Sequence, residues 1–246
     1  MQVKSLASIP FQPYMDNLLE ILTTRDGSRT LYSRQYQQSF HSVHGALTEA
    51  RHVFLEGSGT EELLKTQQEV SVLEIGFGTG LNWLITALAA RRYRVRLTYT
   101  ALDKQIPSAE LLSQLDYGDL IGAPSLAATI EEWRKTFSNE VPYGTYNLPH
   151  EYNSTLQLSL GEATEAILPD RSYDSIYFDA FDPGANPELW VPEFFRQLYK
   201  ALRDGGCLAT YSVAGHVRRA LTASGFSVVR QPGPPGKRQV LAAWKR

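Results

Sequence analysis

Residues 72–83, VLEIGFGTGLNW, decide the fold of this chain. An apolar run that contains one acid, Glu74, leads into three glycines at alternate positions, Gly76, Gly78 and Gly80, and then into a helical pattern. This order predicts a strand, a tight turn and the start of a helix. Glycine has no Cβ, so the backbone of such a turn can approach a ligand closely. The helix N-terminus behind the turn offers free N–H groups and a positive dipole end.

The spacing of the glycines separates two kinds of nucleotide site. A dinucleotide fingerprint is G-x-G-x-x-G, but residue 81 is Leu, so a NAD-dependent oxidoreductase is the weakest interpretation. The E-x-G-x-G-x-G motif resembles the first motif of the class I methyltransferases, which bind S-adenosylmethionine (SAM). The resemblance implies that the cofactor contacts Glu74, Gly76, Phe77, Gly78, Gly80 and Asn82. A strand-to-helix turn without a ligand is the alternative.

Length and composition favour one α/β domain with a modest extension, since the 246 residues are 43% apolar. The net charge of −2 does not indicate a nucleic-acid binder, so a polyanion would need a local basic patch. The single cysteine, Cys207, excludes an internal disulfide and a Cys-based zinc site. Residues Met1–Pro10 lack a signal-peptide pattern, and no segment approaches the ~20 apolar residues of a membrane span. We therefore expect a cytoplasmic protein without a membrane segment.

Strand and helix patterns alternate from residue 70 onward. Such alternation predicts a parallel sheet with helices on both faces. The last two strands have no helix between them and must be antiparallel. The expected fold is therefore a Rossmann-like α/β fold of the class I methyltransferase kind, with a seven-stranded, mostly parallel sheet and a closing antiparallel hairpin. The strands are expected at 70–75, 95–102, 155–160, 173–179, 206–211, 226–231 and 238–244, and the helices at 80–91, 107–115, 126–137, 162–167, 188–202 and 214–223.

The first 68 residues differ from the rest. Asp26-Gly27, between apolar runs at 18–24 and 29–33, predicts a β-hairpin, and the pattern over 42–55 predicts a helix. We expect residues 1–68 to form an N-terminal extension of hairpin and helix that packs on a SAM-dependent methyltransferase domain at 69–246.

Acids follow the second and third strands, where ligands of open α/β sheets bind. Asp103, followed by Lys104, is placed to accept hydrogen bonds from two vicinal ribose hydroxyls, and a helix cap is the alternative. At the next strand end, resemblance to the class implies that an acid such as Glu162 lies beside the adenine. A first-turn helix acid is the equal alternative. The cofactor residues predicted at this strand end are Gly161, Glu162 and Ala163.

The fourth strand end carries the most specific motif, DAFDPGANPELW at residues 179–190. This run resembles the tRNA methyltransferases of the MnmD type, which match the N-terminal half of the bifunctional MnmC proteins. Blocks at 41–54, 74–82, 212–226 and 236–238 are typical of the same family. The resemblance covers the chain from about residue 30 to 241. Two departures lie on the substrate side: Asp182, where the family has a small or neutral residue, and the proline-rich loop 232–236.

The resemblance implies an activity. The family transfers methyl from SAM to the primary amine of 5-aminomethyl-2-thiouridine at the tRNA wobble position, giving 5-methylaminomethyl-2-thiouridine. The implied partner is the anticodon loop of tRNA. The FAD-dependent oxidase half of MnmC is not among these 246 residues, so we expect a stand-alone methyltransferase without FAD.

Two acids are the predicted catalytic residues. An alkylamine has a pKa near ~10 and arrives protonated, and only its neutral lone pair can attack the methyl group. Asp179 is expected to bind the ammonium and to take up or relay a proton, with help from Asp182. The alternative for Asp179 is a cofactor contact, to the ammonium of the methionine part.

Aromatic side chains near the fourth strand end are candidates for stacking on a flipped-out base. Core packing is the alternative for each of these aromatics, Phe181, Trp190 and Tyr211. Pro183 and Asn186, in the same loop, are also assigned to the substrate side. His41 and His44 lack a third ligand, and methyl transfer needs no metal, so no metal site is expected.

Basic residues after the strand ends are predicted to border the anticodon loop. The residues assigned to substrate binding are Arg218, Lys237 and Arg238, with Arg219 and the hairpin residues Arg25, Arg29 and Arg34 nearby. The dense basic run at 91–96 enters the second strand at its other end and is expected to lie opposite the site.

Two other classes of function stay open. Asp179 and Asp182 are compatible with an aminopropyltransferase of the spermidine synthase type, which also needs acids near an amine. A non-catalytic SAM- or RNA-binding module is the second alternative, and the density of acids at the strand ends argues against it.

Overall fold

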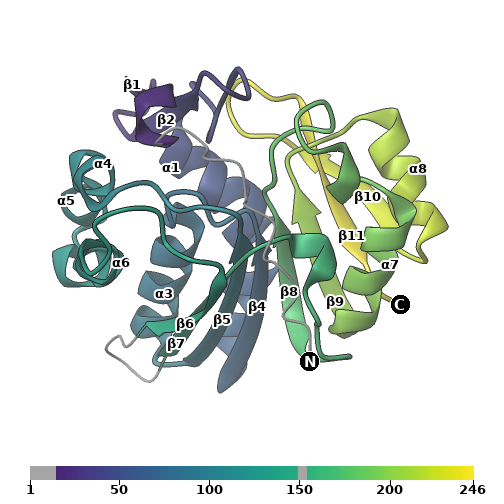
Figure 1. Ribbon diagram of the computed structural model, residues 1–246. Coiled ribbons are helices and arrows are strands. Elements are labelled where there is room, and N and C mark those ends of the chain that lie inside the picture. The colour runs from purple at the N-terminus through teal and green to yellow at the C-terminus, as the bar shows by residue number, and fades with distance from the viewer. Residues whose placement is uncertain (1–14, 149–153) are drawn as a thin grey trace, which may run out of the picture.

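A computed structural model of the chain describes residues 15–148 and 154–246. An eight-stranded sheet forms its centre, in the order β10-β11-β9-β8-β4-β5-β7-β6 (Figure 1). The strands β9, β8, β4, β5 and β7 are parallel, whereas β11 is antiparallel to both β9 and β10. The mostly parallel sheet and its closing hairpin are thus confirmed. The bounds are β4 (Glu69–Ile75), β5 (Arg96–Asp103), β6 (Gly144–Leu148), β7 (Ser154–Leu160), β8 (Tyr173–Phe178), β9 (Leu202–Thr210), β10 (Ser227–Pro232) and β11 (Gln239–Trp244).

The eighth strand, β6, corrects the prediction of seven. It pairs antiparallel with β7 at the edge of the sheet, from Gly144 opposite Leu160 to Leu148 opposite Leu156. Four of its five residues are exposed or half-buried, so the segment lacks the apolar alternation by which a strand is recognised. Because β6 lies at the edge of the sheet, its side chains need not be apolar, and the sequence pattern does not reveal the strand.

The N-terminal hairpin is confirmed. Strands β1 (Leu19–Thr23) and β2 (Arg29–Ser33) pair antiparallel around the Asp26-Gly27 turn, and β3 (Gln38–Ser39) adds a third strand. A short 3₁₀ turn, η1 (Met15–Leu18), precedes them. The segment Met1–Pro10, for which no signal peptide is predicted, lies outside the described residues.

The helices follow the expected order with local differences. The helix predicted over 42–55 is a turn of α-helix followed by a π-helix, and the one predicted over 188–202 is split because Pro192 begins a new helix. Helices α2 and α5 were not predicted. The bounds are α1 (Ala46–Glu49), η2 (Ala50–Glu56), α2 (Thr60–Thr66), α3 (Leu81–Tyr93), α4 (Ala109–Gln114), α5 (Tyr117–Ile121), α6 (Pro124–Lys135), η3 (Ala163–Glu165), η4 (Pro187–Leu189), α7 (Pro192–Ala201) and α8 (Gly215–Ala223).

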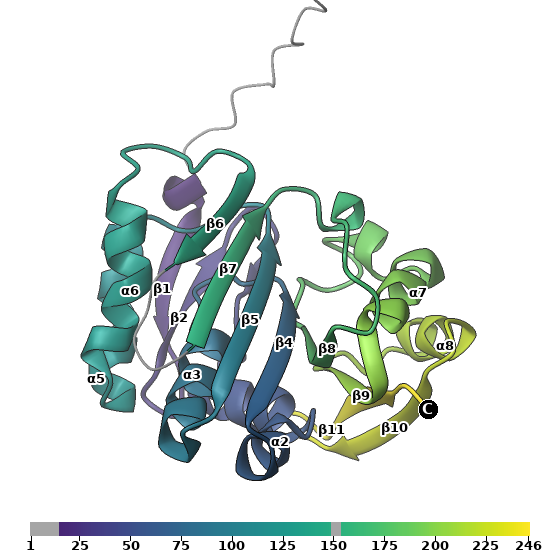
Figure 2. The ribbon, with the colours of Figure 1, turned by 90° about the horizontal axis from the view of Figure 1, so that it is seen from below.

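The sheet separates two hydrophobic clusters. Side chains alternate along a strand, so Val70 and Val72 of β4 join the cluster under α3, while Leu73 and Ile75 join the cluster under α7. Helices α3 and α6 lie on one side of the sheet, and α7 and α8 on the other (Figure 2). Core residues of the N-terminal segment, among them Phe54, belong to the α3-side cluster. The division between residues 68 and 69 stays a prediction.

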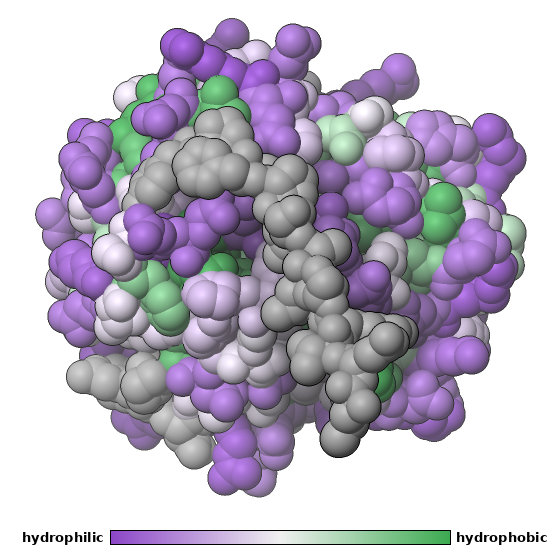
Figure 3. Space-filling view, in the orientation of Figure 1, coloured by the Kyte–Doolittle hydropathy of each residue, from purple (hydrophilic) through white to green (hydrophobic). Residues whose placement is uncertain are grey.

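The surface seen in Figure 3 is mainly hydrophilic, with small separate hydrophobic spots. Single exposed apolar side chains of this kind are normal on a folded protein. None of the helices within 15–148 and 154–246 has the length and apolar character needed to cross a bilayer.

The turn between β4 and α3 requires glycine for a steric reason. Gly76 has φ +89°, and a Cβ there would lie 2.7 Å from the backbone oxygen of Asp179, at the end of the neighbouring strand β8. The ends of β4 and β8 therefore approach each other more closely than any side chain allows.

Replacing Gly76 with Ala should destabilise the fold more than replacing Gly27, whose φ of +84° is similar but whose Cβ would meet nothing within 4 Å. Gly27→Ala should cost only the left-handed backbone strain, about 1–2 kcal/mol. Gly76→Ala adds a clash with the backbone and should cost clearly more. Urea unfolding of the two variants measures this, and equal losses would show that the close approach at Gly76 is relaxed easily.

Candidate active site

A cavity opens at the carboxyl ends of β4, β5 and β8. It encloses about 950 Å³, including solvent at its mouth. Most of the predicted cofactor residues meet here, together with part of the predicted substrate loop: Gly76, Phe77, Gly78, Asp103, Lys104, Gly161, Ala163, Asp179, Phe181 and Asn186. The lining also includes residues that the sequence did not single out for a site, among them Leu19, Ser33, Tyr36, Phe40 and Gln105, as well as His41.

The N-terminal segment supplies an aromatic wall to this cavity. The ring of Phe181 lies 4.7 Å from that of Tyr36 and 5.1 Å from that of Phe40, measured between centroids. Tyr36 and Phe40 were missed because they flank the short strand β3, where no periodicity marks them. Only the tertiary structure brings them beside a residue at the end of β8.

Asp103 braces the glycine turn from the end of β5. Its Oδ2 accepts a hydrogen bond from Gly78 N at 2.7 Å, and its Oδ1 accepts one from Lys104 N at 2.6 Å. Burial raises the pKa of Asp103, and the backbone hydrogen bonds oppose this. The following helix α4 is capped by Ser108, so the helix-cap alternative for Asp103 is wrong.

Lys104 and Glu162 form an ion pair at the edge of the cavity. Lys104 Nζ lies 2.9 Å from a carboxylate oxygen of Glu162 and 3.7 Å from one of Glu188. The side chains of all three are more than a third exposed. Lys104 lines the cavity, whereas Glu162 does not.

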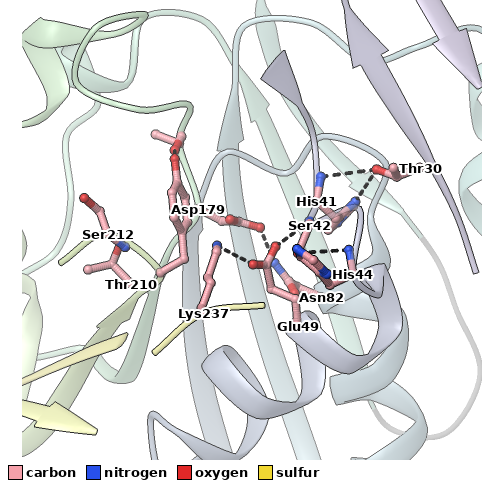
Figure 4. A network of polar contacts seen from close by, with 12 residues as sticks. Thr30, His41, Ser42, His44, Glu49, Asn82, Asp179, Thr210, Ser212 and Lys237 are labelled. Atoms are coloured by element: carbon pink, nitrogen blue, oxygen red, sulfur yellow. Dashed lines mark hydrogen bonds and ion pairs between the residues drawn. The ribbon is translucent and has the colours of Figure 1, made fainter. Parts of the chain in front are cut away.

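A buried hydrogen-bonded triad supports the floor of the site. The Asn82 amide donates to Glu74 Oε1 at 2.8 Å. It also donates to Asp179 Oδ2 at 2.8 Å (Figure 4). Glu74 is fully buried and also accepts from the hydroxyl of Tyr99 at 2.9 Å. The structure therefore leaves Glu74 and Asn82 outside the cavity lining and gives them a positioning role behind Asp179.

The two acids of this triad hold protons more tightly than ordinary carboxyls. Burial raises the pKa of Glu74 to about 8. Burial also raises the pKa of Asp179 well above its usual value, and the nearby carboxylates of Glu49 and Glu74 add to this shift. The hydrogen bond from Asn82 acts in the opposite direction on both acids. Asp179 is thus an acid with raised proton affinity in the wall of the cavity.

The backbone that follows Asp179 is fixed by two aromatic side chains. The hydroxyl of Tyr211 donates to Ala180 O, and the indole of Trp190 donates to Phe181 O, each at 2.9 Å. Trp190 is 4% exposed and packs edge-on against Phe178. Its predicted stacking on a base is therefore wrong, because Trp190 belongs to the core.

Asp182 organises the loop rather than facing Asp179. Its Oδ1 accepts from Gly184 N at 2.7 Å and from Ala185 N at 3.2 Å, and its Oδ2 accepts from the Gln38 amide. Both carboxylate oxygens are used in this way, which contradicts the predicted catalytic assistance. Pro183, beside it, is half-buried and outside the cavity lining.

The side chain of Lys237 contacts helix α1 of the N-terminal segment. Its Nζ forms an ion pair with Glu49, which is 3% exposed, and lies 4.3 Å from the ring centroid of Tyr211. Glu49 also accepts from Ser42 N at 2.8 Å. Lys237 is therefore paired within the protein, and its predicted contact with tRNA stays a prediction. Glu49 lies within the family block at 41–54, but no local signal linked it to the active site.

The other predicted basic residues are dispersed. Arg218 and Arg238 are exposed, as is Arg219, and their side chains make no ion pair with the described residues. Arg29 donates to Gln114 O at 2.7 Å, and Arg34 is paired with Glu20. The run at 91–96 lies at the end of α3 and the start of β5, at the edge of the sheet opposite the cavity, as expected.

His41 lines the cavity with a neutral side chain. It is 6% exposed, its Nδ1 lies 2.9 Å from Thr30 Oγ1, and burial lowers its pKa to about 4. Among the described residues, no three His, Cys, Asp or Glu side chains are grouped as metal ligands would be.

Known proteins resemble the chain in sequence and in structure. A family model described as S-adenosyl-L-methionine-dependent methyltransferase matches residues 124–246. The tRNA 5-methylaminomethyl-2-thiouridine biosynthesis bifunctional protein MnmC of Cupriavidus metallidurans is 37% identical over 231 residues, which cover 91% of this chain and 33% of that protein. MnmC of Paraburkholderia xenovorans is 32% identical over 92% of this chain and 35% of its own. The chain thus spans about a third of these relatives.

A solved structure agrees with these matches. The crystal structure of MNMC2 from Aquifex aeolicus superposes with a TM-score of 0.72 at 25% identity, over 92% of this chain and 70% of that one. The similarity extends over the N-terminal segment as well as the sheet, since little of the chain is left out.

The raised pKa of Glu74 predicts how stability depends on pH. The folded state keeps a proton on Glu74 up to pH about 8, whereas the unfolded chain releases it near pH 4.5. The free energy of unfolding should therefore fall as the pH rises through this window, by up to about 1.4 kcal/mol per pH unit. Glu74→Gln removes this titration and should show a flatter curve, measured by denaturant unfolding from pH 5 to 8. Parallel curves for the two proteins would contradict the assignment.

Proposed function

The chain belongs to the S-adenosyl-L-methionine-dependent methyltransferase family, and on that premise we propose that it methylates the primary amine of 5-aminomethyl-2-thiouridine at the wobble position of tRNA. The product is 5-methylaminomethyl-2-thiouridine. The observation that carries this proposal is Asp179, an acid of raised pKa that Asn82 holds in the wall of the cavity. The likeness to MnmC proteins over nine tenths of the chain supports the choice of substrate.

We assign the cofactor to the carboxyl edge of β4 and β5. SAM, when bound, supplies an electrophilic methyl group on a sulfonium. The Gly76–Gly78 turn offers backbone without side chains, and Asp103 offers a carboxylate to the ribose. We assign Lys104, Gly161 and Ala163 to the adenosine side of the same cavity. Gly80 shapes the turn without lining the cavity, and Glu162 acts through its ion pair with Lys104.

The chemistry asked of this chain is the removal of one proton. An alkylammonium with a pKa near ~10 gives up its proton more easily to a carboxylate of raised pKa than to an ordinary one. Asp179 accepts that proton, which leaves the lone pair of the nitrogen free to attack the methyl group. SAM would leave as S-adenosylhomocysteine, its sulfur keeping the electron pair of the broken S–CH3 bond, and the positive charge would pass to the methylated nitrogen. Asn82 occupies Oδ2 of Asp179, while Oδ1 has no hydrogen bond from the described residues. The second oxygen is therefore free to face the amine.

We assign the substrate base to the aromatic wall. Phe181, with Tyr36 and Phe40, presents ring faces beside Asp179, and stacking on such faces stabilises an unstacked base. The hydroxyl of Tyr211 holds the backbone next to Phe181 by its hydrogen bond to Ala180 O. Asn186 also lines the cavity. Arg218, Arg219 and Arg238 are the candidates for anticodon-loop phosphates. We also propose a cytoplasmic location, because the proposed substrate is a tRNA.

The remaining alternatives lose support from the same geometry. A polyamine substrate would need free carboxylates along the fourth-strand loop, but both oxygens of Asp182 hold the loop itself. A non-catalytic module has no use for a buried triad that tunes and orients one acid in a cavity.

Asp179→Asn should reduce methyl transfer to undermodified tRNA by about 10²–10⁴-fold, because the amide cannot accept the proton. The affinity for S-adenosylhomocysteine should stay within a few-fold of the wild type. Asp182→Asn is the matched control, since its amide oxygen can still accept from Gly184 and Ala185, and its activity should change little. Initial rates with labelled SAM, followed by nucleoside analysis, measure both. Full activity of Asp179→Asn would remove Asp179 from the mechanism.

A further inference from the structure

A primary alkylammonium already lies beside the candidate active site. It is the Nζ of Lys237, from the loop between β10 and β11, which contacts the Glu49 carboxylate (Figure 4). The same Nζ lies 4.3 Å from the ring centroid of Tyr211. A carboxylate and an aromatic face are the two groups that proteins use to bind alkylammonium ions. The substrate proposed above carries the same functional group as a lysine side chain.

The proposed reaction assigns no role to Glu49, although its carboxylate is buried. It is 3% exposed, and a carboxylate buried to this extent is costly unless a cation neutralises it. Its charge raises the pKa of Asp179, second only to burial. Figure 4 shows the carboxylates of Glu49 and Asp179 on either side of the Lys237 ammonium, although one comes from the N-terminal helix and the other from the end of β8.

The Asn82 side chain carries a buried hydrogen-bond acceptor to which no donor of the described residues is bound. Asn82 is 2% exposed, and its Oδ1 has no hydrogen bond within residues 15–148 and 154–246. The same amide group holds Asp179. An ammonium carries three N–H donors. Of the side chains of Glu49, Asn82 and Asp179, Lys237 donates a hydrogen bond to Glu49 alone.

We propose that Lys237 is an internal stand-in for the substrate: its ammonium lies against Glu49 and Tyr211, and the primary ammonium of the tRNA base replaces it there. This inference rests on the proposed function. The Lys237 side chain is 28% exposed, so its flexible stem can swing into solvent without moving the backbone. One cation replaces another, and Glu49 stays neutralised throughout. Glu49 is thereby the residue that selects a charged amine.

The test compares Lys237→Met with the wild type, using n-butylammonium as the probe. Calorimetry at pH 8 on protein saturated with S-adenosylhomocysteine gives its affinity, and steady-state rates give KM for undermodified tRNA. Removal of the tethered competitor should tighten n-butylammonium binding about tenfold, or about 1.4 kcal/mol, and should lower KM. The double variant Glu49→Gln/Lys237→Met, which leaves no unpaired buried charge, should lose this gain.

Arg238→Met is the matched control, because it removes the neighbouring exposed cation. It should raise KM, reduce the salt dependence of tRNA binding and leave the n-butylammonium affinity as in the wild type. Unchanged or weaker n-butylammonium binding by Lys237→Met, or a gain that survives in the double variant, would overturn the inference. The calorimetric test needs no turnover, so it stands apart from the proposed function, which fails if the wild type does not methylate the tRNA.

Discussion

The amide of Asn82 is the constraint on which the site depends. It joins Glu74 of β4 to Asp179 at the end of β8, so that a buried acid and a half-buried acid on neighbouring strands are held by a single side chain from the first turn of α3. The glycine turn makes this possible, since Gly76 lets the ends of β4 and β8 approach closely. Asn82 thus orients Asp179, while the desolvation of Asp179 and the nearby acids Glu49 and Glu74 raise its pKa.

The N-terminal segment contacts the closing hairpin beside this triad. Glu49 of α1 pairs with Lys237 of the β10–β11 loop, and His52 Nε2 lies 2.8 Å from Pro232 O of the same loop. Phe40, next to β3, packs against Phe181. The ends of the sheet strands supply Asp103 and Asp179 to the cavity, and the N-terminal segment supplies Tyr36, Phe40 and His41. In the proposed function, the strand ends hold the cofactor, and the N-terminal segment completes the site for the amine.

Most of the sheet, and many of the residues that line the cavity at its carboxyl edge, could be predicted from the sequence because local patterns encode them. Alternating strands and helices gave the parallel sheet, and strand ends gave Asp103 and Asp179. Strand β6 was missed because its residues are mostly polar and lie at an edge. The roles of Glu49, Tyr36 and Lys237 depend on contacts between segments far apart in the chain, which no spacing rule predicts. Asp182 and Trp190 were misassigned because a motif shows which residues recur, not whether they face the cavity or the loop and core that support it.

The pH dependence of kcat/KM for methylation of tRNA, compared between the wild type and Asn82→Ala, tests the central claim most directly. The hydrogen bond from Asn82 lowers the pKa of Asp179, so its removal should raise that pKa further. Because Asp179 must be ionised to accept the proton, the acid limb of the profile should move to higher pH in the variant. An acid limb at the same pH in both proteins would contradict the claim that Asn82 tunes Asp179 as the proton acceptor.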